Sequence, residues 1–306
     1  MLGREGRARF AALLVAALLL LPAPAGTRSA FTQAASSWTI VGAGDIAVCG
    51  ANQRDSATAV LVAGILAGHP NATAFTAGDN VYPDGSSTNF GDCYQPTWGA
   101  FRSRTRPVPG NHDYYNNPGA AGYFGYFGRR AGPQGRGWYR FDAGTWRVYA
   151  LTSECRKRSR CYRRQYAWLK ADLTSYPHQC VLAIWHRPRF SSGAGHGSST
   201  RMAPVFRLLY QKGAEIVISG HDHGYERFAP TDPTGAINAA GGLRQWVVGT
   251  GGASLYGFGA ALPASEVRDA TSHGVLRLDL HPGAYDWQFL PIAGDDFTDS
   301  GTGTCH

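Results

Sequence analysis

Residues 38–45 read Trp-Thr-Ile-Val-Gly-Ala-Gly-Asp, a short apolar run that ends on a glycine and a carboxylate. The β-branched residues and the length of the run predict a buried strand. The glycine lets the backbone turn tightly where the strand ends. An aspartate at this place lies at the carboxyl edge of a sheet, where α/β proteins keep their functional groups. The run therefore predicts an α/β protein with chemistry at its strand ends.

The same pattern recurs along the chain. Apolar runs that predict further strands cover residues 72–76, 180–185, 215–219, 245–248, 275–280 and 285–290. Apolar spacing predicts helices at 56–66 and 165–173. Residues 137–140 and 146–151 are expected to pair as strands around a turn at 142–144. This order of elements predicts mixed sheets covered by helices.

The composition indicates one globular domain over residues 31–306. Of the 306 residues, 43% are hydrophobic and 16% are charged, which excludes a disordered chain. Glycine and proline are scattered without a period, and no internal repeat is present, so fibrous and solenoid classes are excluded. The formal net charge of the full chain is +8, and it falls to +5 without the four arginines and one glutamate of residues 1–30. This charge favours small anionic molecules and is too small to predict nucleic acid as a partner.

Residues 1–30 have the pattern of a secretory signal peptide. Three arginines precede an apolar run over residues 10–21, which is too short to span a bilayer. Ala23-Pro24-Ala25 has the small-x-small pattern of a cleavage site, and Ala30 is a second candidate. The alternative is a membrane anchor or a helix docked on the domain. We predict a secreted or extracytoplasmic protein with no stable membrane association after cleavage.

All six cysteines lie beyond residue 30. An even number in an exported chain indicates disulfide bonds. Because no Cys-x-x-Cys pair is present, a zinc ribbon or a thioredoxin-like motif has no support. The pairs we expect are Cys49–Cys93 across two loops of the site, Cys155–Cys161 around a small basic loop, and Cys180–Cys305 at the tail.

Five motifs, most of them directly after a predicted strand, carry the chemistry. They are Gly44-Asp45, Gly78-Asp79-Asn80-Val81-Tyr82, Gly110-Asn111-His112-Asp113, Trp185-His186 and Gly220-His221-Asp222-His223. Carboxylate, imidazole and amide oxygen are the ligands of zinc, manganese and iron. Taken singly, each aspartate could cap a helix and Gly110-Asn111 could be a plain turn. Their ordered recurrence predicts a metal site.

The number of candidate ligands predicts two cations. The seven candidates are Asp45, Asp79, Tyr82, Asn111, His186, His221 and His223. Seven ligands exceed the needs of one tetrahedral ion. A two-metal site typically drives the in-line hydrolysis of phosphate esters.

This ordered set resembles the calcineurin-like metallophosphoesterases, and within them the purple acid phosphatases. In its motifs the resemblance covers roughly residues 38–226, and it implies a four-layer α/β/β/α sandwich of two mixed sheets. It also implies a first cation on Asp45, Tyr82 and His223, and a second on Asn111, His186 and His221. Asp79 would bridge the two.

Position 47 bears on which cation is expected. The usual Asp-x-His opening of the superfamily would need a histidine there, but the chain has Ala47. Tyr82, three residues after Asp79, fits the Asp-x-x-Tyr pattern that supplies a phenolate, although a tyrosine here could also simply pack near Pro83. A phenolate prefers a hard, highly charged ion. The resemblance therefore implies iron(III) at the first position and zinc, manganese or iron(II) at the second.

The resemblance assigns three further residues. It implies that His112 contacts the substrate phosphate or the leaving-group oxygen, that Asp113 orients the ring of His112, and that His196 contacts substrate. Purple acid phosphatases usually have glycine where Ala47 stands and glutamate where Asp113 stands.

We expect a phosphatase that hydrolyses small phosphate monoesters by metal-activated hydroxide attack on phosphorus. A phosphodiesterase or nucleotidase on the same centre is the first alternative, and a non-catalytic binding protein of the same fold is the second.

Overall fold

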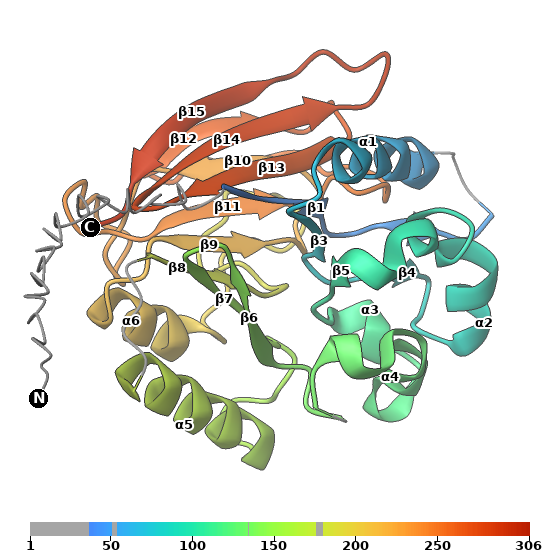
Figure 1. The fold of residues 1–306 in the computed structure, drawn as a ribbon, viewed down its shortest axis with the longest axis horizontal. Helices are drawn as coiled ribbons and strands as arrows, with labels where there is room; N and C mark the ends of the chain where they lie inside the picture. Colours follow the sequence, from blue (N-terminus) through green and yellow to red (C-terminus); the bar gives the residue numbers. More distant parts are fainter. Residues whose placement is uncertain (1–36, 51–53, 134, 176–179) are drawn as a thin grey trace, which may run out of the picture. The chain divides into compact units, whose positions relative to one another are not determined.

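The structure, a computed structural model, describes residues 37–50, 54–133, 135–175 and 180–306. The predicted signal peptide at residues 1–30 lies outside these ranges. Within them, no helix is both long enough and apolar enough to cross a bilayer. Two mixed β-sheets make up the centre of the fold, as Figure 1 shows.

The first sheet has six strands and contains the predicted strand at residues 38–45. Its order is β15 (Asp299–Thr304), β14 (Ala284–Pro291), β13 (Gly274–His281), β1 (Trp38–Ala43), β3 (Ala72–Thr76) and β5 (Thr105–Arg106). Strands β1, β3 and β5 are parallel to one another, whereas β13 is antiparallel to β1. The carboxyl ends of three neighbouring strands therefore point the same way.

The second sheet has seven strands. Its order is β12 (Ser265–Asp269), β10 (Tyr225–Phe228), β11 (Arg244–Val248), β9 (Ile216–Ser219), β8 (Cys180–Ile184), β7 (Trp146–Ala150) and β6 (Tyr139–Ala143). Its four central strands are parallel, and both flanks are antiparallel. A hydrogen bond from the Gly44 N–H to the Val248 carbonyl, 2.8 Å long, joins the ends of β1 and β11 across the two sheets.

The strands of the second sheet alternate between two cores because successive side chains of a strand point to opposite faces. In β8, Leu182 and Ile184 belong to the core shared with the first sheet. Val181 and Ala183 belong to a second core, which the helices α5 (Arg160–Ser175) and α6 (Ala203–Gln211) cover. Figure 1 shows these two helices beside β7, β8 and β9.

Helix α1 (Arg54–Gly68) covers the other sheet. It contacts β1, β3 and β13, and it buries Val62 and Leu66 in the first core. The layers are thus α1, the six-stranded sheet, the seven-stranded sheet, and α5 with α6. This confirms the four-layer arrangement of two mixed sheets.

Most predicted elements are present, with shifted ends. The hairpin of β6 and β7 is antiparallel, but β6 runs through Ala143 because Ala143 pairs with Trp146, so the predicted turn at 142–144 lies partly in the strand. Helix α5 begins at Arg160, five residues before the predicted start at Gln165. Helix α6 was not predicted from the sequence, and neither were the shorter helices α2 (Ser87–Asn89), α3 (Asn111–Tyr114) and α4 (Ala121–Phe127).

The three predicted disulfide bonds are confirmed. Cys49–Cys93, Cys155–Cys161 and Cys180–Cys305 have Cα–Cα distances of 5.2, 5.5 and 5.7 Å. These distances lie within the usual range for a disulfide bond.

Candidate metal centre

Loops at the carboxyl ends of the parallel strands form the site. Asp45 follows β1, Asp79 follows β3, His186 follows β8, and His221 follows β9. A two-stranded parallel sheet of β2 (Ala47–Val48) and β4 (Val81–Tyr82) ties the first two of these loops together. Residues that are far apart in the sequence therefore converge because strand ends of both sheets meet here.

Three of these residues have an unusual backbone. Asp45, Asp79 and His221 have φ angles of 60°, 47° and 74°. Residues with a side chain rarely adopt this left-handed region, and where they do, the conformation is often part of a functional site.

Glycines make room for the two aspartates. A Cβ atom on Gly110 would overlap the backbone nitrogen and Oδ1 of Asp79, and one on Gly220 would lie 2.5 Å from Oδ2 of Asp45. The motif glycines at these two positions are therefore required by close approach to the carboxylates.

We expect Gly110→Ala to disturb the site without removing any functional group. The added methyl group must displace Asp79, and a misplacement of about 1 Å at a catalytic centre costs about 10²-fold in rate. Metal content and turnover would be measured together, with Gly64→Ala as the control because a Cβ on Gly64 meets nothing within 4 Å. Wild-type metal content and turnover in Gly110→Ala would contradict this account.

The first group of donor atoms surrounds the hydroxyl of Tyr82. Its Oη lies 2.9 Å from Oδ1 of Asp45, 3.2 Å from Oδ2 of Asp79 and 3.1 Å from Nε2 of His223. His223 donates from Nδ1 to the Ser254 carbonyl at 2.8 Å, so in its neutral form the ring turns a lone pair toward Tyr82. The single phenolic hydrogen thus faces three acceptors. A cation would accept a lone pair from each.

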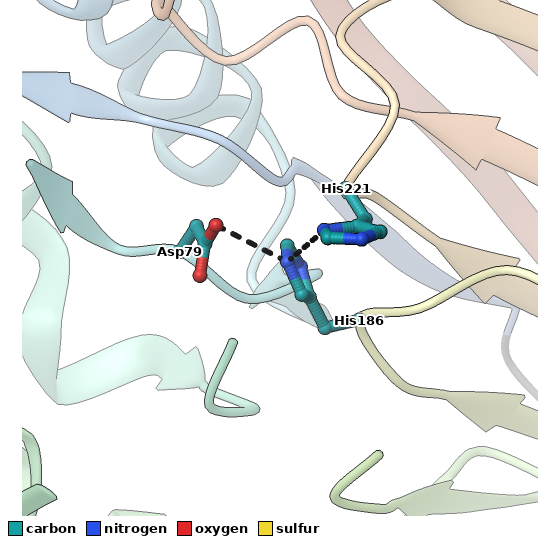
Figure 2. Close-up of side chains that lie close together, drawn as sticks. All are labelled: Asp79, His186 and His221. Carbon is teal, nitrogen blue, oxygen red and sulfur yellow. Dashed lines mark hydrogen bonds and ion pairs between the residues drawn. The ribbon is translucent and has the colours of Figure 1, made fainter. Parts of the chain in front are cut away.

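The second group surrounds Nε2 of His186. This atom lies 3.2 Å from Oδ2 of Asp79, 3.2 Å from Oδ1 of Asn111 and 3.1 Å from Nδ1 of His221. Figure 2 shows Asp79, His186 and His221 pointing toward one another from separate loops. The Ala77 carbonyl, 2.9 Å away, fixes the other ring nitrogen of His186. Because Nε2 carries at most one hydrogen, it cannot satisfy both oxygens.

Asp79 belongs to both groups through the same oxygen. Its Oδ2 is 3.2 Å from Tyr82 Oη and 3.2 Å from His186 Nε2, while its Oδ1 accepts the backbone N–H of His112 at 2.7 Å. The donor atoms of Asp79, His186 and His221 all lie within 4.8 Å of one another. The structure therefore brings together all seven predicted ligands, in two groups that share one carboxylate.

The charges of the site depend on its burial. Asp79 is 1% exposed and His186 is fully buried. Burial favours the neutral form of each, but their mutual attraction outweighs it: the pKa of Asp79 falls to about 2 and that of His186 rises to about 10. Burial, followed by the charges of Asp45 and Asp79, raises the pKa of the Tyr82 phenol well above its usual value. A multivalent cation next to the phenol oxygen has the opposite effect: it lowers the pKa of the phenol and favours the phenolate. The donor set therefore fits a cation pair.

Asp113 has a different role from the one expected. Its Oδ2 accepts hydrogen bonds from the Gly110 N–H at 2.8 Å and from Nδ2 of Asn80 at 2.9 Å. The ring of His112 is instead held by the Pro83 carbonyl, 2.7 Å from Nδ1. Consecutive residues of a helical turn do not face each other, and both lie in α3. The expectation that Asp113 orients the ring is therefore corrected: this carboxyl joins two loops of the site.

Burial of Asp113 has a further effect on its charge. The loss of water raises the pKa of this carboxyl, and nearby Asp79 raises it further, to about 7.

His196 lies beside the second group of donor atoms, and its expected contact with substrate stays a prediction. Its exposed ring stacks on that of His221, with 3.9 Å between ring centroids and 13° between planes. Its backbone N–H donates to Oδ1 of Asp222 at 2.8 Å.

Sequence reasoning missed two neighbours of the candidate ligands. Tyr256 stacks on His223, with 4.0 Å between centroids, and donates its backbone N–H to the His223 carbonyl at 2.7 Å. Arg187 contacts His221 through its guanidinium group. Tyr256 carries no motif, but the position of Arg187 directly after His186 was a signal that could have been used.

Comparisons with known proteins agree with this geometry. The sequence profile of the calcineurin-like phosphoesterases matches residues 39–225. Purple acid phosphatase 21 of Arabidopsis thaliana is 28% identical over 228 residues, which cover 64% of this chain and 50% of the relative. Purple acid phosphatase 18 of the same plant is 27% identical over 176 residues, covering 49% of this chain and 40% of the relative. The chain thus spans about half the length of the curated relatives it matches.

Two solved structures share the fold. Purple acid phosphatase PPD1 from yellow lupin seeds superposes with a TM-score of 0.67 at 20% identity, over 88% of this chain and 54% of that one. GAP50, described as the anchor in the inner membrane complex of Plasmodium, superposes with a TM-score of 0.67 at 14% identity, over 88% of this chain and 89% of that one. With the family profile spanning the strands and loops that build the site, the chain belongs to the calcineurin-like phosphoesterase family.

Proposed function

We propose that this protein is a secreted phosphatase that uses two metal ions to hydrolyse phosphate monoesters. The observation that carries the proposal is the pair of donor groups joined by Oδ2 of Asp79. A cation pair in such a site neutralises charge on a phosphoryl group and lowers the pKa of bound water. Phosphoryl transfer needs little beyond positioning and charge stabilisation, and this arrangement is suited to both.

The donor chemistry suggests which cation each group would hold. Asp45, Tyr82 and His223 combine two anionic oxygens with one nitrogen when the phenol is ionised, which suits iron(III). Asn111, His186 and His221 offer one neutral oxygen and two nitrogens, which suit zinc, manganese or iron(II). Asp79 would complete both sets.

In this proposal His112 serves the leaving group. The Pro83 carbonyl takes the hydrogen on Nδ1, so Nε2 is the nitrogen left for substrate. The ring is half-buried and lies against that of Tyr82, with 4.4 Å between centroids. In its doubly protonated form, a histidine so fixed can donate a hydrogen bond or a proton from Nε2 to the leaving oxygen.

We expect His112→Ala to keep its metals and to lose about 10²- to 10⁴-fold in turnover, the usual contribution of a positioned acid or base. Metal analysis and steady-state kinetics would be run on the same preparation. His281→Ala is the control, since His281 pairs with exposed Asp286 at the end of β13. Unchanged turnover in a metal-replete His112→Ala protein would remove this role.

The whole proposal is tested by an assay on purified protein with metal analysis alongside. We expect two metal ions per chain, hydrolysis of a chromogenic monoester, and a visible absorption band from Tyr82 bound to iron(III). Preference for a diester would favour a phosphodiesterase or nucleotidase. Two bound metals without either activity would favour a binding protein, a role compatible with the fold since a solved protein with this fold is described as an anchor.

The proposed location rests on the disulfide bonds. Three pairs are present, and such bonds persist mainly in oxidising compartments. Together with the predicted signal peptide, they support export from the cytoplasm.

A further inference from the structure

The guanidinium group of Arg187 lies on the outer side of the second donor group. Its Nη1 is 2.7 Å from Nε2 of His221, while Nδ1 of the same ring faces His186 at 3.1 Å. The two nitrogens of an imidazole lie on different edges of the ring. The imidazole of His221 thus separates the guanidinium from His186.

A buried carboxylate fixes this guanidinium. Nε of Arg187 is 2.9 and 3.2 Å from the two carboxylate oxygens of Glu154, whose side chain is 7% exposed. The backbone N–H of Arg187 donates to Oγ of Ser153 at 3.0 Å, and the same hydroxyl donates to Glu154 at 2.9 Å. An arginine held at both ends loses little freedom when it binds an anion.

The loop that carries Glu154 is itself anchored. Gln165 of α5 accepts the Thr152 N–H at 2.8 Å and donates to the Thr152 carbonyl at 2.9 Å. On the other side of Glu154, the Cys155–Cys161 disulfide closes the loop. The position of Arg187 is therefore set before any substrate arrives, which is the condition for effective charge stabilisation.

The guanidinium keeps donors available for a ligand. Of its five N–H groups, Nε–H is used by Glu154 and one on Nη1 by His221. In the part of the chain that the structure describes, no acceptor is recorded for Nη2. A neutral imidazole has one lone pair. When His221 gives the lone pair of Nδ1 to a cation, Nε2 carries the hydrogen and Nη1 of Arg187 also becomes free to donate.

We propose that Arg187, positioned by Glu154, binds an unesterified oxygen of the substrate phosphoryl group and thereby sets a preference for monoesters over diesters. The inference rests on the proposed function. A monoester keeps three unesterified oxygens and a diester keeps two. An additional fixed donor therefore stabilises the phosphoryl group of a monoester more than that of a diester. Arginine is suited to this task because its planar donors match phosphate oxygens.

The first test compares two substrates in Arg187→Ala. Removal of one fixed donor to a transition-state charge costs about 10²- to 10³-fold, so we expect kcat/KM for an aryl phosphate monoester to fall by that factor. The fall for the matching aryl diester should be smaller, because a diester keeps one unesterified oxygen fewer. Arg268→Ala removes an equal charge from an exposed position on β12 and should leave the ratio unchanged. Equal losses on both substrates would overturn the inference.

The second test does not depend on turnover. Inorganic phosphate would be titrated into metal-loaded wild-type protein and Arg187→Ala, with metal content measured on both. We expect an equal metal content and a weaker phosphate affinity in the variant. Equal affinities would overturn the inference. If the wild-type protein hydrolyses neither ester, the proposed function fails, while this titration still decides whether Arg187 binds phosphate.

The role of Glu154 is tested by a double-mutant cycle. Glu154→Gln keeps the size of the side chain and removes its charge, so we expect a smaller loss on the monoester than in Arg187→Ala. If Glu154 acts through Arg187, adding Glu154→Gln to Arg187→Ala should change the substrate ratio no further. Additive losses would show that Glu154 is not a positioning residue for Arg187.

Discussion

Replacement of Asp79 by asparagine is expected to abolish activity while leaving the fold intact. The variant keeps the shape of the side chain but removes the one charge that both donor groups share through Oδ2, 3.2 Å from Tyr82 and 3.2 Å from His186. An amide also presents either a neutral oxygen or hydrogens where a cation needs an anionic oxygen. Loss of several kcal/mol of charge stabilisation corresponds to about 10³-fold or more in rate.

The measurement is metal stoichiometry followed by turnover on a monoester. We expect wild-type protein to hold two ions per chain and Asp79→Asn to hold fewer. Asp286→Asn, an exposed carboxylate at the start of β14, is the matched control. Thermal unfolding of all three proteins separates loss of the site from loss of the fold. Two bound ions and near-normal turnover in Asp79→Asn would refute the bridging position.

Removal of the Cys180–Cys305 bond is expected to give the largest loss of stability. Cys180 begins β8 in the seven-stranded sheet and Cys305 follows β15 in the six-stranded one, 125 residues later. In the chain-entropy account, closing a loop of this length lowers the conformational entropy of the unfolded chain and thereby adds about 5 kcal/mol to the free energy of unfolding. This is a large part of the 5–15 kcal/mol that typically separates folded from unfolded domains.

The matched control is the shorter bond. Cys155–Cys161 closes a separation of only 6 residues, for which the same account gives about 2 kcal/mol. Paired alanine substitutions at each bond would be compared by equilibrium denaturant unfolding. We expect removal of Cys180–Cys305 to lower the free energy of unfolding by more than twice as much as removal of Cys155–Cys161. Equal losses would show that the length of the closed loop does not govern stability here.

That the candidate ligands lie close together could be predicted from the sequence because each lies at or near a strand end. Asp45, Asp79, His186 and His221 each follow a run of buried apolar residues, and the carboxyl ends of neighbouring parallel strands meet at the same edge of their sheet. Local patterning therefore implied a long-range arrangement. The same pattern predicted mixed sheets covered by helices, and the family resemblance implied that there are two of them.

The orientation of side chains could not be predicted in the same way. Asp113 follows His112 directly, yet a single turn of α3 sends the two side chains in different directions, to Asn80 and to Pro83. Tyr256 was missed because it reaches His223 from a loop with no apolar period. Such contacts depend on how the loops pack against one another in space. Neither the spacing of apolar residues nor secondary-structure propensity predicts this packing.

The left-handed backbone at Asp45, Asp79 and His221 has a consequence for selection in the laboratory. A residue with a side chain costs about 1 kcal/mol or more in this conformation, whereas glycine adopts it freely. Glycine at any of these positions would relax the chain and remove a donor in the same step. A screen for heat resistance alone would therefore enrich variants that lack a donor, so directed evolution of this protein needs a readout of metal binding or of the proposed activity in every round.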